Sequence, residues 1–412
     1  MDAPHHAAKA ADADRDLHAL ALNSGSSSLK FGLYRIRGSQ ITRVLVGEAE
    51  GLGQQLGAFY AEDAHGKVIL SETAAPTSQG QAIDRIAGIL AASGTPPPQV
   101  IGHRIVHGGP AHVAHCRIDD TVLRELQAAT AFAPLHMPAA LSVIRHAGAR
   151  FPDLPQVACF DTSFHRSMPD VASVLALPQE MRALGIRRYG FHGLSCESIV
   201  RQLGQTDGGV PKRLAIAHLG NGASITAVRG GASIDTSMGL TPSGGVIMGT
   251  RSGDLDPGIL VYLARERHFD AAMLEDLVDH RSGLRGISRL SSDMRALHAA
   301  ALSNADARLA IAMFCQSVRK QIGAMSVVLD GLDLLVFTGG IGENDSAVRA
   351  SICQGLSSIG VQAEAGSPPQ PGQTHSSCRV RVVTSLEDEQ IALHAAALCP
   401  AFSRRPPRAG AG

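Results

Sequence analysis

The chain has 412 residues with 37 basic and 37 acidic side chains, so its formal net charge is +0. This length is enough for two domains with substantial cores. A neutral chain gives no electrostatic reason to expect nucleic acid or an anionic membrane as a partner. No uninterrupted apolar run reaches roughly 18 residues, and residues 1–16 lack the apolar core of a signal peptide. We therefore expect a cytoplasmic protein, with its seven cysteines reduced because none has CxxC spacing.

Residues 1–16 are rich in Ala, Asp and His without periodicity and predict a disordered extension. Residues 19–34 then predict a strand, a tight turn and a second strand. The turn, Asn23 to Ser28, contains only small residues, so its N–H groups and hydroxyls can surround a phosphate. Lys30 adds a positive charge beside it. A Ser/Gly hairpin without a ligand explains this turn about as well.

The rest of the first half alternates strand and helix patterns. Residues 100–109 predict a buried strand that carries Arg104, a charge that needs an anionic partner there. Asp161 stands where the strand pattern of residues 157–165 ends, the position at which ligands bind in open α/β sheets, although a capping Asp is the simpler explanation. Further strands are expected at 31–36, 43–49 and 67–70, and helices at 81–92, 121–130 and 139–149.

Residues 214–228 repeat the arrangement of an apolar run, a Gly/Asn turn and a second apolar run. Two such hairpins, one in each half, suggest a duplicated architecture with phosphate held between the halves. The Gly/Ser/Thr-rich segment 235–254 is too poor in bulky residues to build a core, and long ordered loops of this kind are usually functional. Arg251 is its strongest candidate residue.

Residues 334–344 predict a buried strand, a glycine turn and a helix, an arrangement in which a nucleotide can lie against backbone. No Gly-x-x-x-x-Gly-Lys-Ser/Thr motif occurs, so phosphate binding of the P-loop kind is excluded. Other expected helices are 196–203, 257–267, 271–279, 292–302, 305–329 and 387–397, with a strand at 380–384 and a tail from 400.

Together these segments resemble the acetate kinase family of the actin-like superfamily, from about residue 20 to residue 394. The resemblance implies an α/β, duplicated actin-like (ribonuclease H-like) fold of two domains with the active site in the interdomain cleft. The expected domains are residues 17–162 and 163–399, with a last helix that can pack back on the first domain and a flexible tail at 400–412. Nine strings agree in order and spacing: 23–31, 103–109, 160–165, 189–193, 218–224, 235–242, 248–257, 291–295 and 338–344.

The resemblance also implies roles for individual residues. Asp161, His192, Arg251 and Arg104 match the catalytic residues, and the two arginines grip the carboxylate and the transferring phosphoryl group. Asn23 and Glu387 match the magnesium ligands, where Mn²⁺ is a possible substitute. The acid-binding pocket corresponds to Arg104, Val106, Leu135, Phe191 and Pro242. The nucleotide-binding residues correspond to Lys30, His218, Leu219, Gly220, Asn221, Gly222, Asp293, Met294, Arg295, Gly340, Ile341, Gly342, Glu343 and Asn344.

The implied activity is reversible, magnesium-dependent transfer of a phosphoryl group from ATP to acetate, which gives acetyl phosphate and ADP, in a homodimer. Phosphoryl transfer needs fixed cations and donors, which these residues supply. The alternatives are a propionate or butyrate kinase and, from another class, a non-catalytic ATP-dependent actin-like switch. Three departures from the family pattern are Cys196, where many members have His, the segment Pro242-Ser-Gly-Gly245, and the segment Ser385-Leu-Glu-Asp-Glu389 around Glu387.

Overall fold

The computed structural model describes residues 16–25, 27–54, 57–73, 76–361 and 378–399. The extension at 1–15, Ser26 of the first turn, and the tail at 400–412 lie outside the described residues. The chain divides into two compact units, Met1–Ser163 with Leu386–Gly412 (unit 1) and Phe164–Ser385 (unit 2). The boundary expected from the sequence lies between residues 162 and 163, and the expected second domain, 163–399, includes a last helix that can pack back on the first domain. Among the described helices, none is long and apolar enough to span a membrane.

Unit 1 is built on an eight-stranded sheet of order β5-β4-β3-β2-β1-β6-β8-β7. Strands β1, β6 and β8 are parallel neighbours, and β1 also forms an antiparallel hairpin with β2. The elements are β1 (Leu17–Ser24), β2 (Ser28–Arg37), β3 (Gln40–Glu50), β4 (Ala58–Asp63), β5 (Val68–Glu72), α2 (Gln79–Ala92), β6 (Val100–Ile105), β7 (Cys116–Arg117), α3 (Asp120–Ala128), η1 (Ala129–Phe132), α4 (Met137–Arg150), β8 (Gln156–Phe160) and α15 (Glu387–Leu398).

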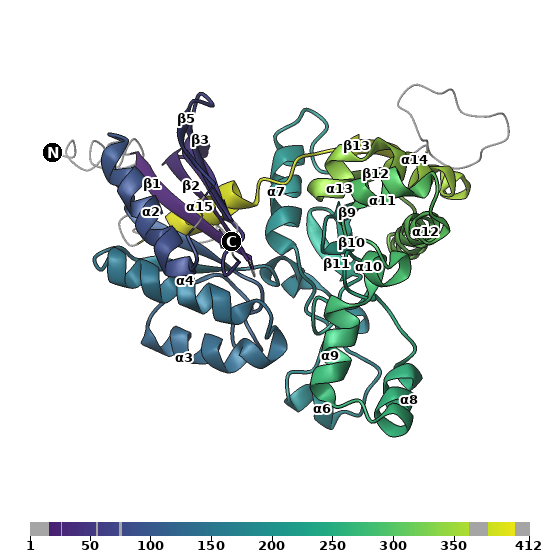
Figure 1. Cartoon of the computed structure of the whole chain (residues 1–412). Helices are drawn as coiled ribbons and strands as arrows, with labels where there is room; N and C mark the ends of the chain where they lie inside the picture. Colours follow the sequence, from purple (N-terminus) through teal and green to yellow (C-terminus); the bar gives the residue numbers. More distant parts are fainter. Residues whose placement is uncertain (1–15, 26, 55–56, 74–75, 362–377, 400–412) are drawn as a thin grey trace, which may run out of the picture. The chain divides into compact units, whose positions relative to one another are not determined.

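Helices cover both faces of this sheet (Figure 1). Side chains alternate between the faces of a strand, and Ile101 joins the apolar core that includes Ile83 of α2 and Val143 of α4. The next residue, Gly102, faces α15: a Cβ built there would lie 2.7 Å from Cγ2 of Ile391. Glycine therefore allows α15 to approach the backbone of β6 closely.

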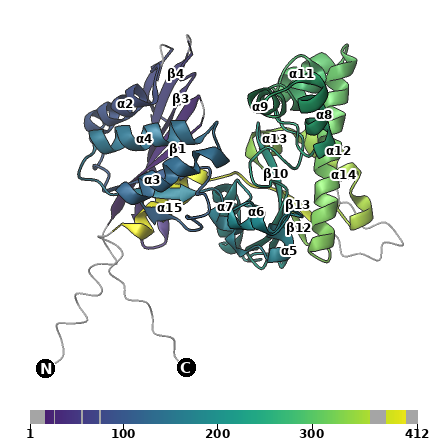
Figure 2. The same cartoon turned by 90° about the horizontal axis from the view of Figure 1, so that it is seen from below.

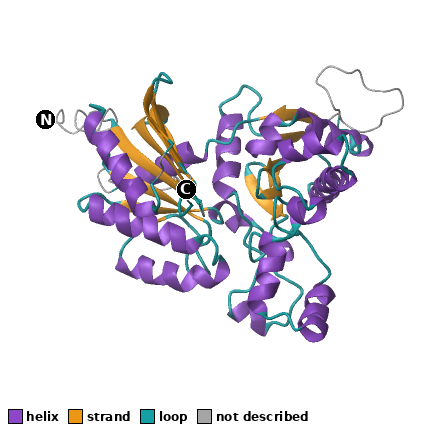
Figure 3. Ribbon diagram, viewed as in Figure 1, coloured by secondary structure: helices purple, strands orange, loops and turns teal. Residues whose placement is uncertain are grey.

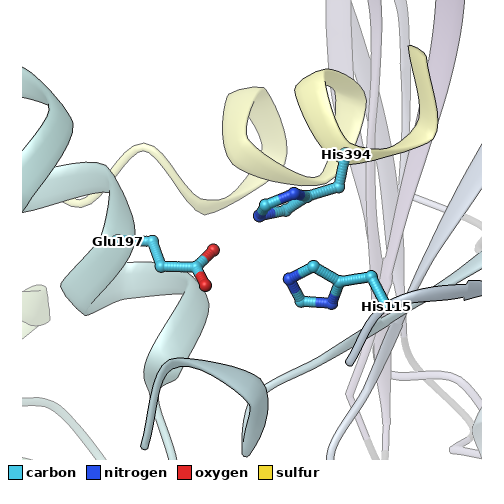
Figure 4. Close-up of side chains that lie close together, drawn as sticks. All are labelled: His115, Glu197 and His394. Atoms are coloured by element: carbon cyan, nitrogen blue, oxygen red, sulfur yellow. The ribbon is translucent and has the colours of Figure 1, made fainter. Parts of the chain in front are cut away.

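Two histidines of unit 1 meet where α15 passes the end of β8. The ring centroids of His115 and His394 are 3.9 Å apart (Figure 4). His115 Nδ1 also accepts the backbone N–H of Phe160 at 3.0 Å, and the side-chain amide of Gln390 lies 3.1 Å from Nε2 of His394. These contacts fix the middle of α15 beside the strand that precedes Asp161.

Unit 2 contains a five-stranded sheet of order β11-β10-β9-β12-β13. Its strands and helices are drawn in orange and purple in Figure 3. The elements are η2 (Ser163–Ser167), α5 (Asp170–Ser173), α6 (Glu180–Ala183), α7 (Gly193–Gly204), β9 (Arg213–Leu219), β10 (Ala223–Arg229), β11 (Ala232–Thr236), α8 (Pro257–Arg267), α9 (Ala271–His280), α10 (Gly283–Ser288), α11 (Met294–Ala301), α12 (Ala305–Val328), β12 (Leu334–Thr338), α13 (Gly339–Asn344), α14 (Ser346–Gln354), η3 (Ser357–Ile359) and β13 (Arg379–Val382).

The two sheets share one topology. Three antiparallel strands in the order third, second, first are followed by two strands parallel to the first: β3-β2-β1-β6-β8 in unit 1 and β11-β10-β9-β12-β13 in unit 2. The long helix α12, with α14 beside it, is seen clearly in Figure 2. The duplication predicted from the two hairpins is therefore present in the strand order itself.

Candidate functional site

In unit 1, predicted site residues gather at the carboxyl ends of three adjacent parallel strands. Asn23 is near the end of β1, Arg104 near the end of β6, and Asp161 directly after β8. Carboxyl ends of neighbouring parallel strands lie at the same edge of a sheet, and the backbone N–H of Asp161 donates to the carbonyl of Ile105 at 2.9 Å. The fold thus brings together residues that are far apart in the sequence.

Arg104 is the hub of this cluster. Its Nε and Nη2 donate to Oδ2 of Asp161 at 3.0 and 2.7 Å, and its Nη1 donates to Oδ1 of Asn23 at 3.2 Å. Burial alone would lower the pKa of the guanidinium, but Asp161 and then Glu387 more than offset this effect and raise it. The cation that the sequence placed in an apolar strand therefore has its anionic partner, and Asp161 orients it.

The first turn of α15 adds two carboxylates to the same cluster. The amide Nδ2 of Asn23 donates to Oδ1 of Asp388 at 2.9 Å and to Oε2 of Glu387 at 3.3 Å. Desolvation raises the pKa of Asp388, and the neighbouring Glu387 carboxylate raises it further. Two acidic groups held so close together repel each other, and a hard cation with oxygen ligands relieves that repulsion. The donor set therefore fits a magnesium ion.

The other predicted residues of unit 1 are Lys30, Val106 and Leu135. Lys30 on β2 is more than half exposed and lies 3.9 Å from Glu48. The positive charge of Lys30 acts to lower the pKa of Asp388, so Lys30 belongs with the acidic side chains of unit 1. The other predicted nucleotide-binding residues lie in unit 2. Val106 follows β6 and is buried, while Leu135 is half-buried in the Pro-flanked loop before α4.

In unit 2, His192 lies at the N-cap of α7 in the left-handed backbone conformation, with φ of 57°. This conformation is strained for a residue other than glycine, and residues held in it cluster at functional sites. Its ring stacks on that of His218 with centroids 4.1 Å apart. The preceding Phe191 is fully buried, and its carbonyl accepts a hydrogen bond from Nε2 of His165 at 2.9 Å.

Arg251 lies next to the same glycine as His192. A Cβ built on Gly222 would be 3.3 Å from Nε2 of His192 and 3.4 Å from Nη1 of Arg251. Nη1 of Arg251 also donates to the carbonyl of Pro242 at 3.2 Å, which ties it to another predicted residue. Two nitrogen donors of unit 2 are therefore directed at the turn between β9 and β10.

The glycine segments predicted to bind nucleotide also converge in part. β9 and β12 pair in parallel, with His218 opposite Thr338. A Cβ on Gly339 would lie 3.1 Å from Nε2 of His218, and a Cβ on Gly220 would lie 4.0 Å from the N–H nitrogen of Gly340. The segments Leu219–Gly222 and Gly340–Asn344 therefore meet at the carboxyl ends of adjacent strands.

The predicted group of Asp293, Met294 and Arg295 forms the start of α11. Asp293 is its N-cap and accepts from the backbone N–H groups of Arg295 and Ala296. A side-chain hydrogen bond from Arg295 lowers the pKa of Asp293 to about 2. This ion pair is exposed, and Met294 is buried. The polar contacts of Asp293 and Arg295 are therefore with each other and with the backbone of the first turn of α11.

Several residues at these sites were not predicted from the sequence. Asp388 is one, although a run of acids opening a helix is a usable signal. His165 is another: it is fully buried between Ser233 and Phe191, and burial lowers its pKa to about 4. Ser224 and Ser195, bonded to the two stacked histidines, are also new. Cys196 is fully buried, with its thiol 3.8 Å from the hydroxyl of Thr226.

Comparison with known proteins identifies what the chain is similar to. A model of the acetokinase family matches residues 18–393. An acetate kinase of Methylocella silvestris is 40% identical over 394 residues, which covers 92% of this chain and 97% of the relative. The crystal structure of a propionate kinase from Francisella tularensis superposes with a TM-score of 0.82 at 35% identity, covering 92% and 98% of the two chains. That of Porphyromonas gingivalis acetate kinase gives 0.78 at 32%, covering 93% and 99%. The predicted α/β, duplicated actin-like fold is thereby confirmed.

Proposed function

We propose that this chain, which belongs to the acetokinase family, transfers a phosphoryl group reversibly between ATP and acetate. A carboxylate oxygen of acetate attacks the γ-phosphorus of ATP, a P–O bond forms to give acetyl phosphate, and the bond to ADP breaks. The observation that carries this proposal is a set of fixed cationic and neutral donors, Arg104, Arg251 and His192, in a chain of this family. Phosphoryl transfer depends on such donors more than on covalent partners.

The residues of unit 1 are proposed to act on the acid and the metal. Arg104 holds the carboxylate, and Asp161 keeps its guanidinium oriented through two hydrogen bonds. A carboxylate nucleophile is already ionised near pH 7, so no general base is required. Asn23 and Glu387, joined by Asp388, would hold magnesium. When bound, the ion neutralises charge on the phosphate oxygens.

The residues of unit 2 are proposed to act on the nucleotide and the transferred group. Nη1 of Arg251 and Nε2 of His192 flank Gly222, so both donors can stabilise negative charge that develops on the equatorial oxygens. The glycine segments around Gly220 and Gly340 leave the backbone accessible to phosphate. Phe191 and Pro242 of unit 2 are proposed to contact the acyl group, and the same role is proposed for Val106 and Leu135 of unit 1.

The proposal is tested by trapping acyl phosphate with hydroxylamine. Purified protein is incubated with MgATP and, in separate reactions, acetate, propionate or butyrate. We expect the signal to be strongest with acetate and to fall with chain length, although one methylene is discriminated by only about 1–3 kcal/mol. A maximum with propionate or butyrate would assign another acid, and no signal with any acid, alongside ATP binding, would favour the nucleotide-dependent switch.

Two arginine variants test the assigned roles. Arg104→Ala and Arg251→Ala should each lower kcat by about 100- to 1000-fold, because each removes a fixed cation that faces developing charge. Arg85→Ala in unit 1 and Arg281→Ala in unit 2 are matched controls, since both side chains are about half exposed in ion pairs on the surface. Turnover near that of the wild-type enzyme in either test variant refutes the role given to that arginine.

A homodimer formed through unit 2 is part of the same proposal. None of the residues of helix α8 is buried. Among the described elements, α8 packs mainly against α9 (Figure 1). Leu255 just before it is 42% exposed, and Ile259, Val261 and Tyr262 on it are 42%, 59% and 48% exposed. Clustered apolar side chains of this size on a surface helix favour association. We further propose that the reaction takes place in the cytoplasm.

A further inference from the structure

The two stacked histidines of unit 2 each have a serine hydroxyl at the same ring atom. Nδ1 of His192 lies 2.9 Å from Oγ of Ser224, and Nδ1 of His218 lies 2.8 Å from Oγ of Ser195. The rings are stacked with 20° between their planes. They come from different elements, the N-cap of α7 and strand β9, so the matching contacts do not result from a sequence repeat.

The direction of each hydrogen bond can be argued from the hydroxyl protons. Ser385 donates its hydroxyl to Oγ of Ser195 at 2.9 Å, so the proton of Ser195 is available for Nδ1 of His218. Ser224 is fully buried, and His192 is the one side-chain partner of its hydroxyl in the described part of the chain. If that hydroxyl accepted from Nδ1–H, its own proton would be buried without an acceptor, which is unfavourable.

A hydroxyl that donates to Nδ1 of a neutral imidazole leaves the proton of that ring on Nε2. Both Nε2 atoms face glycines of the proposed phosphate-binding segments: a Cβ on Gly222 would be 3.3 Å from that of His192, and a Cβ on Gly339 would be 3.1 Å from that of His218. Two imidazolium cations stacked at 4.1 Å would repel each other, so the geometry favours neutral rings.

We infer that Ser224 and Ser195 are positioning residues that hold His192 and His218 as neutral Nε2–H tautomers, so that both rings present an N–H donor to phosphoryl oxygens. The inference rests on the proposed phosphotransfer. It assigns Ser385 the role of fixing the donor direction of Ser195, and Glu343 fixes Ser385 in turn by accepting its backbone N–H at 3.0 Å. The serines act through the imidazoles and need not touch the substrate.

The test combines nitrogen NMR with kinetics. Protein labelled with ¹⁵N-histidine is examined by long-range ¹H–¹⁵N correlation, and His192→Gln and His218→Gln identify the two signals. We expect both rings of the wild-type protein in the Nε2–H form. Ser224→Ala should shift the His192 signal toward a mixture of tautomers and lower kcat by about tenfold or more. The KM values of Ser224→Ala for acetate and for ATP should stay within about threefold of the wild-type values.

Two further substitutions distinguish an effect on the histidine tautomer from an effect on side-chain packing. Ser224→Thr keeps the hydroxyl and should keep the His192 tautomer. Thr226→Val removes a buried hydroxyl two residues along the same strand that bonds to Thr236, not to an imidazole, and should leave the signals and kcat unchanged. Should Ser224→Ala fail to fold, Ser385→Ala tests the same inference through His218, whose signal should shift.

The outcomes also separate this inference from the proposed function. An Nδ1–H signal for His192 in the wild-type protein, or a His192 signal that Ser224→Ala leaves unchanged, overturns the inference even if the enzyme is active. Absence of acyl phosphate formation with any acid refutes the proposed function, while the NMR experiment still reports the two tautomers in the same sample.

Discussion

At the scale of single residues, hydrogen bonds and close packing fix the side chains of the proposed site in one orientation. Arg104 donates hydrogen bonds to Asp161 and Asn23, and Gly222 leaves space for the side-chain donors of His192 and Arg251. Both residues were predicted from the sequence: Arg104 because a charge in an apolar strand needs an anionic partner, and Gly222 through the resemblance to the acetate kinase family. Ser224, Ser195 and His165, which bond to His192, His218 and the carbonyl of Phe191, were not predicted, since a Ser or His in a strand or turn has many structural uses.

Gly222→Ala should lower kcat about 10- to 100-fold, because the new methyl group would lie within 3.4 Å of both His192 Nε2 and Arg251 Nη1. Thermal stability should change little, since the contacts can relax through side chains. Gly323→Ala on α12 is the control, because a Cβ there meets no atom within 4 Å. Steady-state kinetics decide the matter: an alanine variant with the wild-type kcat would show that this space is not used.

Acid should destabilise the protein in part through His165. Burial lowers the pKa of this residue to about 4, whereas an unfolded chain has a histidine pKa of about 6.5. Below pH 6.5 the unfolded state binds a proton that the folded state does not, so stability is present above that pH and is lost as pH falls toward 4. We expect a loss of roughly 2 kcal/mol from this group between pH 7 and pH 5.

Urea unfolding of the wild-type protein and His165→Gln at these two pH values measures that loss. The variant should have a smaller pH-dependence, while His65→Gln, at an exposed position, should not alter it. His103 is a second buried histidine, and burial lowers its pKa to about 4 as well, so part of the acid effect remains in the variant. Equal pH-dependence in wild type and His165→Gln contradicts the assignment.

At the scale of elements, strong periodic patterns were predictable and weak ones were not. Helix α8 occupies Pro257–Arg267 as expected, since Asp256 caps it and Pro257 suits its first turn. β4 (Ala58–Asp63) and α10 (Gly283–Ser288) were missed because alanine and glycine weaken their patterns. β6 ends at Ile105 rather than near Gly109, whose φ of 64° does not continue a strand.

The contact between β6 and α15 gives an element-scale prediction. Gly102→Ala should destabilise unit 1 by about 1–3 kcal/mol and lower kcat, because its Cβ would force α15, which carries Glu387 and Asp388, away from the sheet. Ile391→Ala should cost about 2–4 kcal/mol alone. The double variant should be less destabilised than the sum of the two, as measured by chemical unfolding. Additive costs would mean that these residues do not compete for space.

At the scale of the whole molecule, the shared strand order of the two sheets explains why duplicated hairpins in the sequence were informative. Each hairpin places its turn beside the carboxyl end of a parallel strand, and this arrangement recurs in both units. The sequence alone could not assign α15 to unit 1, because the packing of a carboxyl-terminal helix against the first strand depends on contacts between residues far apart in the chain.

Val261→Asp and Tyr262→Glu should convert the proposed homodimer to monomers, because each places a charge in an apolar surface on α8. Sedimentation velocity over a range of micromolar concentrations measures the change. Val171→Asp is the matched control, since Val171 is 92% exposed and lies on α5 of the same unit. A wild-type protein that sediments as a monomer throughout this range contradicts the proposal.

The order of the two units along the chain bears on how the protein is made. Unit 2 is one continuous segment, Phe164–Ser385, whereas unit 1 needs Leu386 onward to complete it. During synthesis from the amino terminus, the sheet of unit 1 emerges first but waits for α15 to cover the face at Gly102. Unit 2 can finish folding before that helix leaves the ribosome. A nascent chain therefore carries this face of the sheet uncovered until α15 has been synthesised.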